Sequence, residues 1–262
     1  MNSRIKTPLV GRHALVTGAS RGIGAAIARD LVAEGLCVTL CARDERTLRG
    51  LTEELGGEAQ AVGVVTDVAD PASVRAAFAR ARAQFGPVEV LINNAGQAAS
   101  AKFTDTDEAL WTRLLSVNLT GTYLCTREAI PDMLAQGFGR IVNVASIAGL
   151  RGAPLLSAYV TSKHAVVGLT RSLALEYATQ NITVNAVCPG YVDTDMVKGA
   201  VANIMKKTGR SEAEARGTLI ATNPQGRLVE AQEVADTVLW LCRPGAESIT
   251  GQCIVLAGGG VG

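Results

Sequence analysis

Short runs of hydrophobic residues alternate along this chain with longer segments whose apolar positions recur at helical spacing. The short runs predict buried strands at residues 12–17, 37–41, 61–65, 88–93, 141–145, 182–187 and 253–256. The longer segments predict helices at about residues 25–34, 45–55, 71–85, 107–135, 154–178 and 231–241, and residues 195–225 are expected to be irregular and polar. Because strands and helices alternate, we expect a seven-stranded parallel sheet of the doubly wound α/β class, with helices on both faces.

No linker, repeat or low-complexity segment interrupts this alternation, so we expect a single domain spanning residues 1–262. A formal net charge of +1 gives no general attraction to nucleic acid or to a membrane. The first residues contain no long apolar run, so no secretory leader and no membrane span are expected. Scattered cysteines and only two histidines make a metal site improbable, and a reduced, cytoplasmic setting is expected.

Three glycines separate the first predicted strand from the first predicted helix: Gly18, Gly22 and Gly24. Glycine lets a backbone approach a pyrophosphate, and a helix N-terminus offers N–H groups and a positive dipole. The spacing is Gly-x-x-x-Gly-x-Gly and not the commoner Gly-x-Gly-x-x-Gly, so a plain tight turn is the alternative. The position between strand and helix favours a dinucleotide site of the Rossmann type.

The end of the second predicted strand indicates which dinucleotide would bind. An acid at this point normally binds the adenosine ribose of NAD, but this chain has Ala42 followed by Arg43. A guanidinium pairs with the 2′-phosphate of NADP, whereas a carboxylate would repel it. Arg21 in the glycine loop is a second cation, and two solvated surface arginines are the alternative. We therefore predict NADP(H) as the cofactor.

Ser146, Tyr159 and Lys163 form the candidate reaction centre. Ser146 closes a predicted strand, and Tyr159 and Lys163 are four residues apart on a predicted helix, where they share a face. A nearby cation favours the phenolate and lowers the pKa of a tyrosine, which is about 10 in water. Such a tyrosine can exchange a proton with a carbonyl or alcohol oxygen that a serine holds. An ordinary amphipathic helix with a solvated lysine is the alternative.

The chain resembles the short-chain dehydrogenase/reductase family over about residues 10–260. The resemblance lies in Thr17–Gly24, in Asp67–Val68, in Asn93–Gly96, in the set Asn118, Ser146, Tyr159 and Lys163, and in Pro189–Thr194. Pro224–Arg227 and Ile249–Gln252 are similar to segments of 3-oxoacyl-thioester reductases and polyketide ketoreductases. The resemblance implies an NADP(H)-dependent enzyme that interconverts a ketone and a secondary alcohol, and that reduces a 3-oxoacyl thioester or related carbonyl.

The resemblance also implies a role for each matched residue. Tyr159 would be the acid/base, and Lys163 would hold the nicotinamide ribose and lower the pKa of that tyrosine. Ser146 would orient the carbonyl, and Asn118 would hold a water in a proton relay. Structural alternatives are a turn cap at Asp67 and a strand brace at Asn93. The implied cofactor contacts are Gly18, Ser20, Arg21, Gly22, Ile23, Gly24, Arg43, Asp67, Val68, Asn94, Ala95, Gly96, Tyr159, Lys163, Pro189, Gly190, Val192 and Thr194.

Other functions stay open at this stage. The same residues could oxidise a cyclic or steroid-like secondary alcohol. A non-catalytic NADP-binding regulatory protein is a second alternative, because a fold does not fix a function. A serine hydrolase is disfavoured, because a Gly-x-Ser-x-Gly elbow needs glycine where Val144 stands.

Residues 195–225 are expected to form a lid over the substrate. Between Met196 and Arg210 they contain no acid and four cations, namely Lys198, Lys206, Lys207 and Arg210. These cations would attract an anionic handle, such as coenzyme A or a phosphopantetheine carrier protein. A solvated helix face whose charges pair with Glu212 and Glu214 is the alternative.

A homotetramer is the expected assembly. The helix that carries Tyr159 continues with an apolar run at residues 165–169, and the last strand leads into a glycine-rich tail at residues 257–262. The resemblance implies that these two elements build a tetramer.

Overall fold

The computed structural model describes residues 9–260. Its centre is a seven-stranded sheet in the order β3-β2-β1-β4-β5-β6-β7, and all neighbouring strands are parallel. The predicted sheet is therefore confirmed. The expectation about a leader at residues 1–8, and the part of the tail contact at residues 261–262, lie outside the described residues. The strands are β1 His13–Thr17, β2 Cys37–Ala42, β3 Ala61–Val65, β4 Val90–Asn93, β5 Gly139–Val144, β6 Ile182–Pro189 and β7 Cys253–Leu256.

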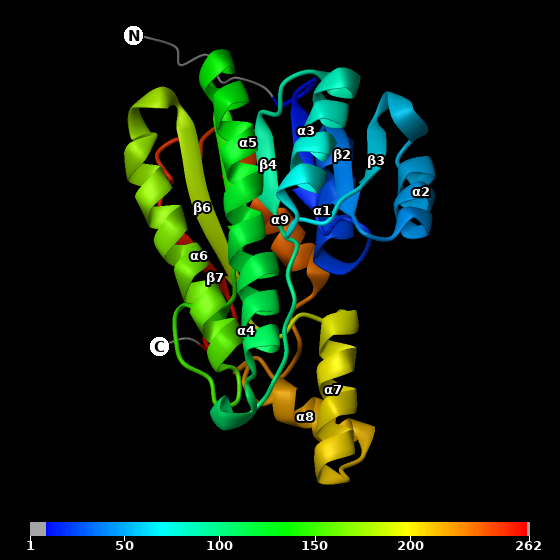
Figure 1. Ribbon diagram of the computed structural model, residues 1–262, viewed down its shortest axis with the longest axis vertical. Helices are drawn as coiled ribbons and strands as arrows, with labels where there is room; N and C mark the ends of the chain where they lie inside the picture. Colours follow the sequence, from blue (N-terminus) through cyan, green and yellow to red (C-terminus); the bar gives the residue numbers. More distant parts are fainter. Residues whose placement is uncertain (1–8, 261–262) are drawn as a thin grey trace.

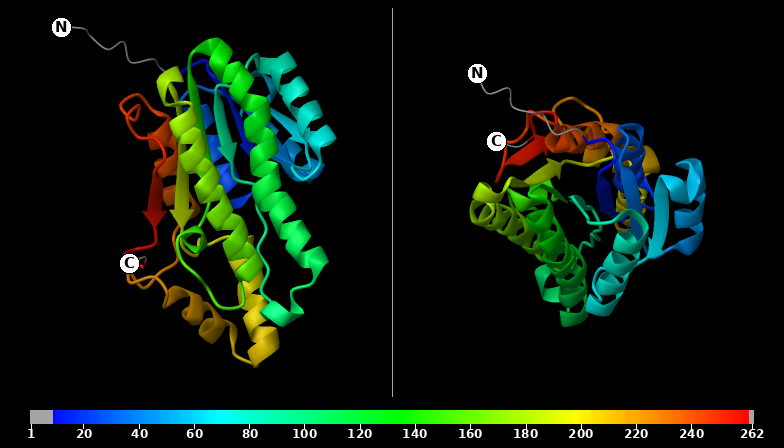
Figure 2. Two further views of the ribbon diagram at one scale, coloured as in Figure 1. Left: turned by 60° about the vertical axis from the view of Figure 1, so that its left-hand side comes forward. Right: turned by 90° about the horizontal axis from the view of Figure 1, so that it is seen from above.

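Helices cover both faces of the sheet (Figures 1 and 2). On one face, Leu31 of α1, Leu48 of α2 and Val238 of α9 join the apolar residues of the strands in one core. On the other face, Phe78 of α3 and Met133 of α5 lie in a second core. Burial on both sides explains why the strands are continuous apolar runs. The helices are α1 Gly22–Ala33, α2 Glu45–Glu54, α3 Pro71–Phe85, α4 Glu108–Leu115, α5 Gly121–Gln136, α6 Ser157–Glu176, α7 Asp195–Thr208, α8 Glu212–Ile220 and α9 Ala231–Cys242.

The helix predicted at residues 107–135 is divided by a π-helical turn. The turn, Ser116–Thr120, separates α4 from α5, and in it Gly121 N–H donates to Ser116 O. A π turn adds one residue to the helical repeat and is often found at a functional site. The prediction of one regular helix was wrong here, because a single inserted residue barely changes the apolar pattern.

Residues 195–225 were predicted to be irregular, and that prediction was wrong, because they form α7 and α8. Ser211 and Glu214 make a capping box that begins α8. Val197 of α7 and Leu219 of α8 meet in a small apolar cluster. Val197, Val201, Ile204 and Met205 recur at helical spacing, so the helical period was present in the sequence and was overlooked beside the exposed charges.

The strand order reverses between β1 and β4, because the chain runs outward from β1 to β3 and then crosses back to β4. Open α/β sheets bind ligands in the crevice beyond the carboxyl ends of the strands at such a point. α7 and α8 lie beyond this end of the sheet (Figure 1). The fold therefore places the predicted lid next to the predicted site.

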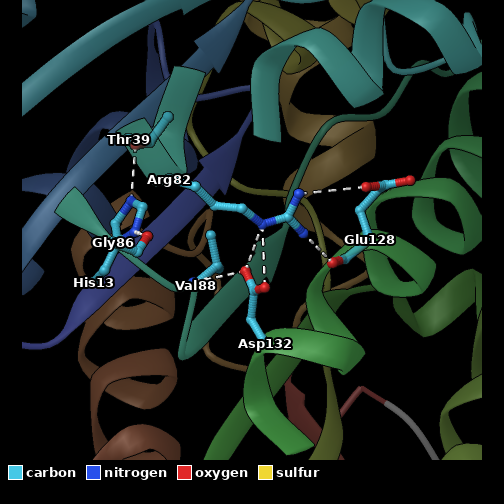
Figure 3. Close-up of polar contacts among 7 residues, drawn as sticks. All are labelled: His13, Thr39, Arg82, Gly86, Val88, Glu128 and Asp132. Atoms are coloured by element: carbon cyan, nitrogen blue, oxygen red, sulfur yellow. Dashed lines mark hydrogen bonds and ion pairs between the residues drawn. The ribbon is translucent and has the colours of Figure 1, made fainter. Parts of the chain in front are cut away.

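A polar cluster lies at the opposite, amino-terminal ends of the strands (Figure 3). Arg82 of α3 donates from Nε to Asp132 Oδ2 of α5 at 2.9 Å. Buried His13 lies 2.9 Å from both Gly86 O and Thr39 Oγ1, and burial lowers the pKa of its imidazole. These contacts involve α3, α5, β1, β2 and the loop after α3, so we assign the cluster to stability.

Within residues 9–260, no helix is long and apolar enough to cross a membrane. The same residues contain no group of three His, Cys, Asp or Glu side chains that could hold a metal ion. All the cysteines are free thiols.

Candidate active site

The glycine loop is folded tightly against the end of β4. Asn94 donates from Nδ2 to the carbonyl oxygens of Thr17 and Gly18, both at 3.0 Å. Gly18 has φ +64°, and a Cβ there would lie 2.9 Å from the Cα of Ala95. A Cβ on Gly24 would lie 2.5 Å from Asn94 Nδ2. These two positions therefore need glycine because of the packing, and not only because of a ligand.

The N-terminus of α1 faces the turn that follows β6. Its N-cap residue, Arg21, makes no side-chain capping hydrogen bond, and no acid lies in the first turn. A Cβ on Gly22 would lie 3.2 Å from Thr194 Cγ2. Ser20 and Ile23 are partly exposed on either side of this contact. Free N–H groups and a positive dipole at this point suit an anion such as a pyrophosphate.

The two arginines predicted to select NADP have different surroundings. Arg43 is exposed at the end of β2. The acid beside it, Asp44, caps α2 by accepting from Thr47 N–H at 2.9 Å. Arg21 Nη1 lies 3.3 Å from Asp195 Oδ2 at the start of α7. The first acid after β2 is therefore engaged with a helix, and the guanidinium of Arg43 remains accessible to a phosphate.

Asp67 and Val68 follow β3 and have contacts of their own. Asp67 Oδ1 accepts from Ala69 N–H at 2.9 Å, which is the geometry of a turn cap. Val68 is buried against Gly121, where a Cβ would lie 2.8 Å from Val68 Cγ2. The turn-capping alternative for Asp67 is thus present in the structure, and the carboxylate keeps further acceptor sites for a ligand.

The turn after β6 is held in place from two sides. Pro189 ends β6, and Gly190 N–H donates to the last residue of β7 at 2.9 Å. Val192 forms a parallel bridge with Val229, and Thr194 Oγ1 donates to Val192 O at 3.2 Å. The turn is thereby fixed beside the glycine loop.

Ser146, Tyr159 and Lys163 come together at the end of β5. Ser146 Oγ accepts from Ala148 N–H at 3.1 Å and lies near enough to the Tyr159 phenol to lower its pKa. Lys163 Nζ donates to Val144 O at 2.8 Å and lies 5.9 Å from the centroid of the Tyr159 ring. Ser146 and Lys163 are buried, whereas Tyr159 is partly exposed. The structure therefore brings the three predicted side chains together.

The charges of this centre differ from the expectation that Lys163 lowers the pKa of Tyr159. Burial raises the pKa of Tyr159, and the nearby Ser146 hydroxyl opposes that rise. Burial also lowers the pKa of Lys163 to about 8. The ammonium donates to a backbone carbonyl and not to the phenol, and the loss of hydration is the largest influence on the pKa of both groups. Tyr159 is therefore a neutral phenol at pH 7.

Asn118 is buried in the π turn, near the lysine. Its Oδ1 accepts from Gln97 N–H at 2.8 Å, and its Nδ2 donates to Gln97 O and to Ser162 Oγ, both at 2.9 Å. A Cβ on Gly96 would lie 3.4 Å from Asn118 Oδ1 and 3.6 Å from Lys163 Nζ. The two side chains therefore border the same space. Both hydrogens of the Asn118 amide are used by these protein partners, which fixes the orientation of the side chain beside Lys163.

Comparison with known proteins agrees with this arrangement. A family model described as short chain dehydrogenase matches residues 12–204. The chain belongs to the short chain dehydrogenase family. It is 44% identical over 249 residues to the granaticin polyketide synthase putative ketoacyl reductase 1 of Streptomyces violaceoruber, with 94% of this chain and 92% of that protein covered.

Two further matches extend the comparison. The dehydrogenase described here is 40% identical over 251 residues to the cis-4-hydroxycyclohexanecarboxylate dehydrogenase of Sinomonas cyclohexanicum, with 95% of this chain and 96% of that protein covered. A crystal structure of an actinorhodin polyketide ketoreductase variant with NADPH matches with a TM-score of 0.91 and 42% identity, covering 95% of this chain and 97% of that one. The predicted resemblance to polyketide ketoreductases is confirmed.

Three residues of this short chain dehydrogenase lie at the site without having been predicted there: Gln97, Ser162 and Tyr191. Gln97 holds Asn118 through its backbone. Ser162 is three residues after Tyr159, and this helical spacing was a signal that could have found it. Tyr191 lies close enough to Tyr159 to raise its pKa further, and it packs against the cluster of α7 and α8.

The lid of the dehydrogenase contacts the loop after β4. Asn203 Nδ2 of α7 donates to Ser100 Oγ at 3.0 Å, and Lys207 Nζ donates to Ser100 O at 3.4 Å. Among residues 9–260, no ion pair joins a lid cation to Glu212 or Glu214 at contact distance. Glu214 accepts from the backbone N–H and the hydroxyl at the start of α8, and the charge of Arg210 helps to lower the pKa of its carboxyl. The alternative in which lid charges interact with these two acids therefore stays open.

Proposed function

We propose that this short chain dehydrogenase reduces a ketone to a secondary alcohol with NADPH, and that Tyr159 donates the proton. The observation that carries the proposal is the position of Tyr159 near Ser146 and beside the buried Lys163, at the point where the strand order reverses. Reduction consumes a proton at the carbonyl oxygen, and a neutral phenol can supply it. Near pH 7 the protonation state of Tyr159 favours reduction over oxidation.

The residues around the glycine loop fit a dinucleotide that carries a 2′-phosphate. The cradle of Gly18, Gly22 and Gly24 has no side chains, and the N–H groups of α1 lack a side-chain cap. Arg43 is exposed where the 2′-phosphate would lie. When bound, NADPH supplies the hydride. We propose that the cofactor contacts predicted from the sequence are the ones used, with Lys163 at the nicotinamide ribose.

Each side chain of the reaction centre has a separate role in the transfer of the proton. Ser146 Oγ already accepts from Ala148 N–H, so its hydroxyl hydrogen can be donated to the substrate carbonyl. Tyr159 gives its proton to the same oxygen and becomes a phenolate. The ammonium of Lys163 stabilises this phenolate by charge, and Asn118 holds the water from which a new proton arrives.

We propose a 3-oxoacyl thioester, carried by coenzyme A or a carrier protein, as the substrate. The granaticin relative is named a ketoacyl reductase, which is this class of reaction. On the lid, Lys206 and Arg210 are exposed and make no ion pair within residues 9–260, whereas Lys198 pairs with Asp195. Exposed cations at the mouth of the site would attract the phosphates of either carrier.

A cyclic secondary alcohol or ketone is the second candidate substrate. The relative from Sinomonas cyclohexanicum is named as a dehydrogenase of a hydroxylated cyclohexane ring, at an identity close to that of the ketoacyl reductase. The same serine, tyrosine and lysine would serve both reactions, so the choice depends on the pocket and not on the reaction centre.

A substrate panel tests the proposed function. We expect NADPH oxidation with an oxoacyl coenzyme A ester, a lower KM for that ester than for its short neutral thioester analogue, and a smaller difference at high salt. Salt should act in this way because the Debye length falls from about 10 Å at 0.1 M to about 3 Å at 1 M. Turnover of cyclic ketones alone would select the second candidate. NADPH binding without turnover of any carbonyl would contradict both and favour a regulatory protein.

A further inference from the structure

Ser162 is a buried hydroxyl between two residues of the reaction centre. It lies on α6, and its side chain is fully buried. Its Oγ donates to Tyr159 O at 2.7 Å and accepts from Asn118 Nδ2 at 2.9 Å. These two bonds join the π turn to the backbone of the proposed proton donor.

The hydrogen bonds around Ser162 can have only one direction. A backbone carbonyl only accepts and an amide Nδ2 only donates, so the Ser162 hydroxyl hydrogen must point to Tyr159 O. The amide of Asn118 cannot be reversed either, because Gln97 N–H faces Oδ1 and Gln97 O faces Nδ2. Reversal would leave buried groups unpaired, at a large cost. The four residues therefore form one fixed arrangement.

This arrangement fixes the backbone of the π turn. The carbonyl of Asn118 accepts from Thr122 Oγ1 at 2.9 Å, which ties the turn to the start of α5. The Asn118 side chain and Lys163 Nζ border the same space beside Gly96. The position of the Asn118 side chain beside Lys163 therefore depends on where Ser162 holds the turn.

We propose that Ser162 is a positioning residue for proton transfer in this enzyme. It touches no reacting atom and acts through Asn118, whose side chain it holds beside the Lys163 ammonium, on the proposed route of the returning proton. The inference rests on the proposed ketone reduction. Because Ser162 lies away from the glycine loop, its loss should slow the proton transfer and leave cofactor binding unchanged.

α6 carries a second buried hydroxyl with the same pattern, which provides a matched control. Thr170 Oγ1 donates to Val166 O at 2.8 Å and accepts from Asn143 Nδ2 at 2.8 Å. Thr170 is also fully buried. Asn143 lies on β5 and not in the π turn. Removing the Thr170 hydroxyl takes away the same two kinds of hydrogen bond from the same helix. It does not change any contact of Asn118.

The test compares Ser162→Ala with Thr170→Val, each of which removes a hydroxyl and adds no bulk. We expect Ser162→Ala to lower kcat by about tenfold to a hundredfold, as a misplacement near 1 Å can. The solvent deuterium isotope effect on kcat should rise, and the NADPH Kd measured by fluorescence should stay within about twofold. Thr170→Val should lower the melting temperature similarly but keep the kcat and the isotope effect of the wild type.

Three results would overturn the inference: a kcat for Ser162→Ala equal to that of Thr170→Val, an unchanged isotope effect, or equal losses of kcat and NADPH affinity. If Ser162→Ala does not fold, Ser162→Cys keeps the shape with a weaker acceptor, and its kcat should fall by a smaller factor. If the cysteine variant had the same kcat as the wild type, that result would also overturn the inference. A wild-type enzyme that binds NADPH but reduces no ketone would instead contradict the proposed function.

Discussion

At the scale of single residues, burial sets the charges of the reaction centre. The spacing of Tyr159 and Lys163 was enough to predict that they share a helix face, and the structure places them together. The direction of the Tyr159 pKa shift could not be predicted, because spacing does not show how much water a group loses. Burial raises this pKa and lowers that of Lys163 to about 8.

These shifts predict how the two directions of the reaction depend on pH. Below about pH 8, Lys163 is an ammonium and Tyr159 a phenol, so the rate of ketone reduction should be level. Above that pH, Lys163 loses its charge first and the reduction rate should fall. Oxidation of the product alcohol should rise over the same range, because a phenolate must accept the proton.

The measurement is kcat/KM in both directions across the pH range, with circular dichroism at each pH to show that the protein stays folded. A reduction rate that increases through pH 8 would be incompatible with a neutral phenol as the donor.

At the scale of elements, the sequence predicted the regular parts of the fold and missed the irregular ones. All seven strands were placed correctly, because burial on both faces makes them continuous apolar runs. The π turn at Asn118 was not predicted, since one inserted residue leaves little trace in a periodic pattern. The helices within residues 195–225 were also missed, because their apolar residues form a small cluster of their own among many exposed charges.

The end of β2 gives a prediction about cofactor choice. Ala42→Asp with Arg43→Leu would place a carboxylate where the 2′-phosphate binds and would remove its cation. A hydrogen bond to a charged group contributes about 1.5–3 kcal/mol, which is about one to two decades in affinity. We therefore expect the double variant to prefer NADH, as measured by kcat/KM for each cofactor. Arg49→Leu is the control, because it removes a nearby exposed cation of α2 that pairs with Glu45. An unchanged preference for NADPH in the double variant would show that Arg43 does not determine the choice of cofactor.

At the scale of the whole molecule, the edges of the sheet bear on the expected homotetramer. The argument from residues 165–169 is weakened, because Val166 and Val167 are buried in the core of their own chain. The argument from the last strand is stronger, since within residues 9–260 β7 pairs with β6 alone, and Val255 is 41% exposed on it. An unpaired edge strand with an exposed apolar residue is a surface for another chain.

We therefore expect a tetramer mass by solution scattering at micromolar concentration. Val255→Asp should yield a smaller species, because it places a charge in the contact at β7. Val65→Asp is the matched control on β3, the other edge of the sheet, and should keep the wild-type mass. A monomer mass for the wild-type protein would contradict the expected tetramer.

The central claim is that Tyr159 donates the proton in an NADPH-dependent ketone reduction, and Tyr159→Phe tests it most directly. The variant loses only the phenolic hydroxyl, so the NADPH Kd should stay within about twofold. The kcat should fall by about 10²–10⁴, which is the usual contribution of a general acid. Tyr177→Phe makes the same change just after α6, away from the centre, and should keep the wild-type kcat. A Tyr159→Phe enzyme that reduces ketones at nearly the wild-type kcat would contradict the claim.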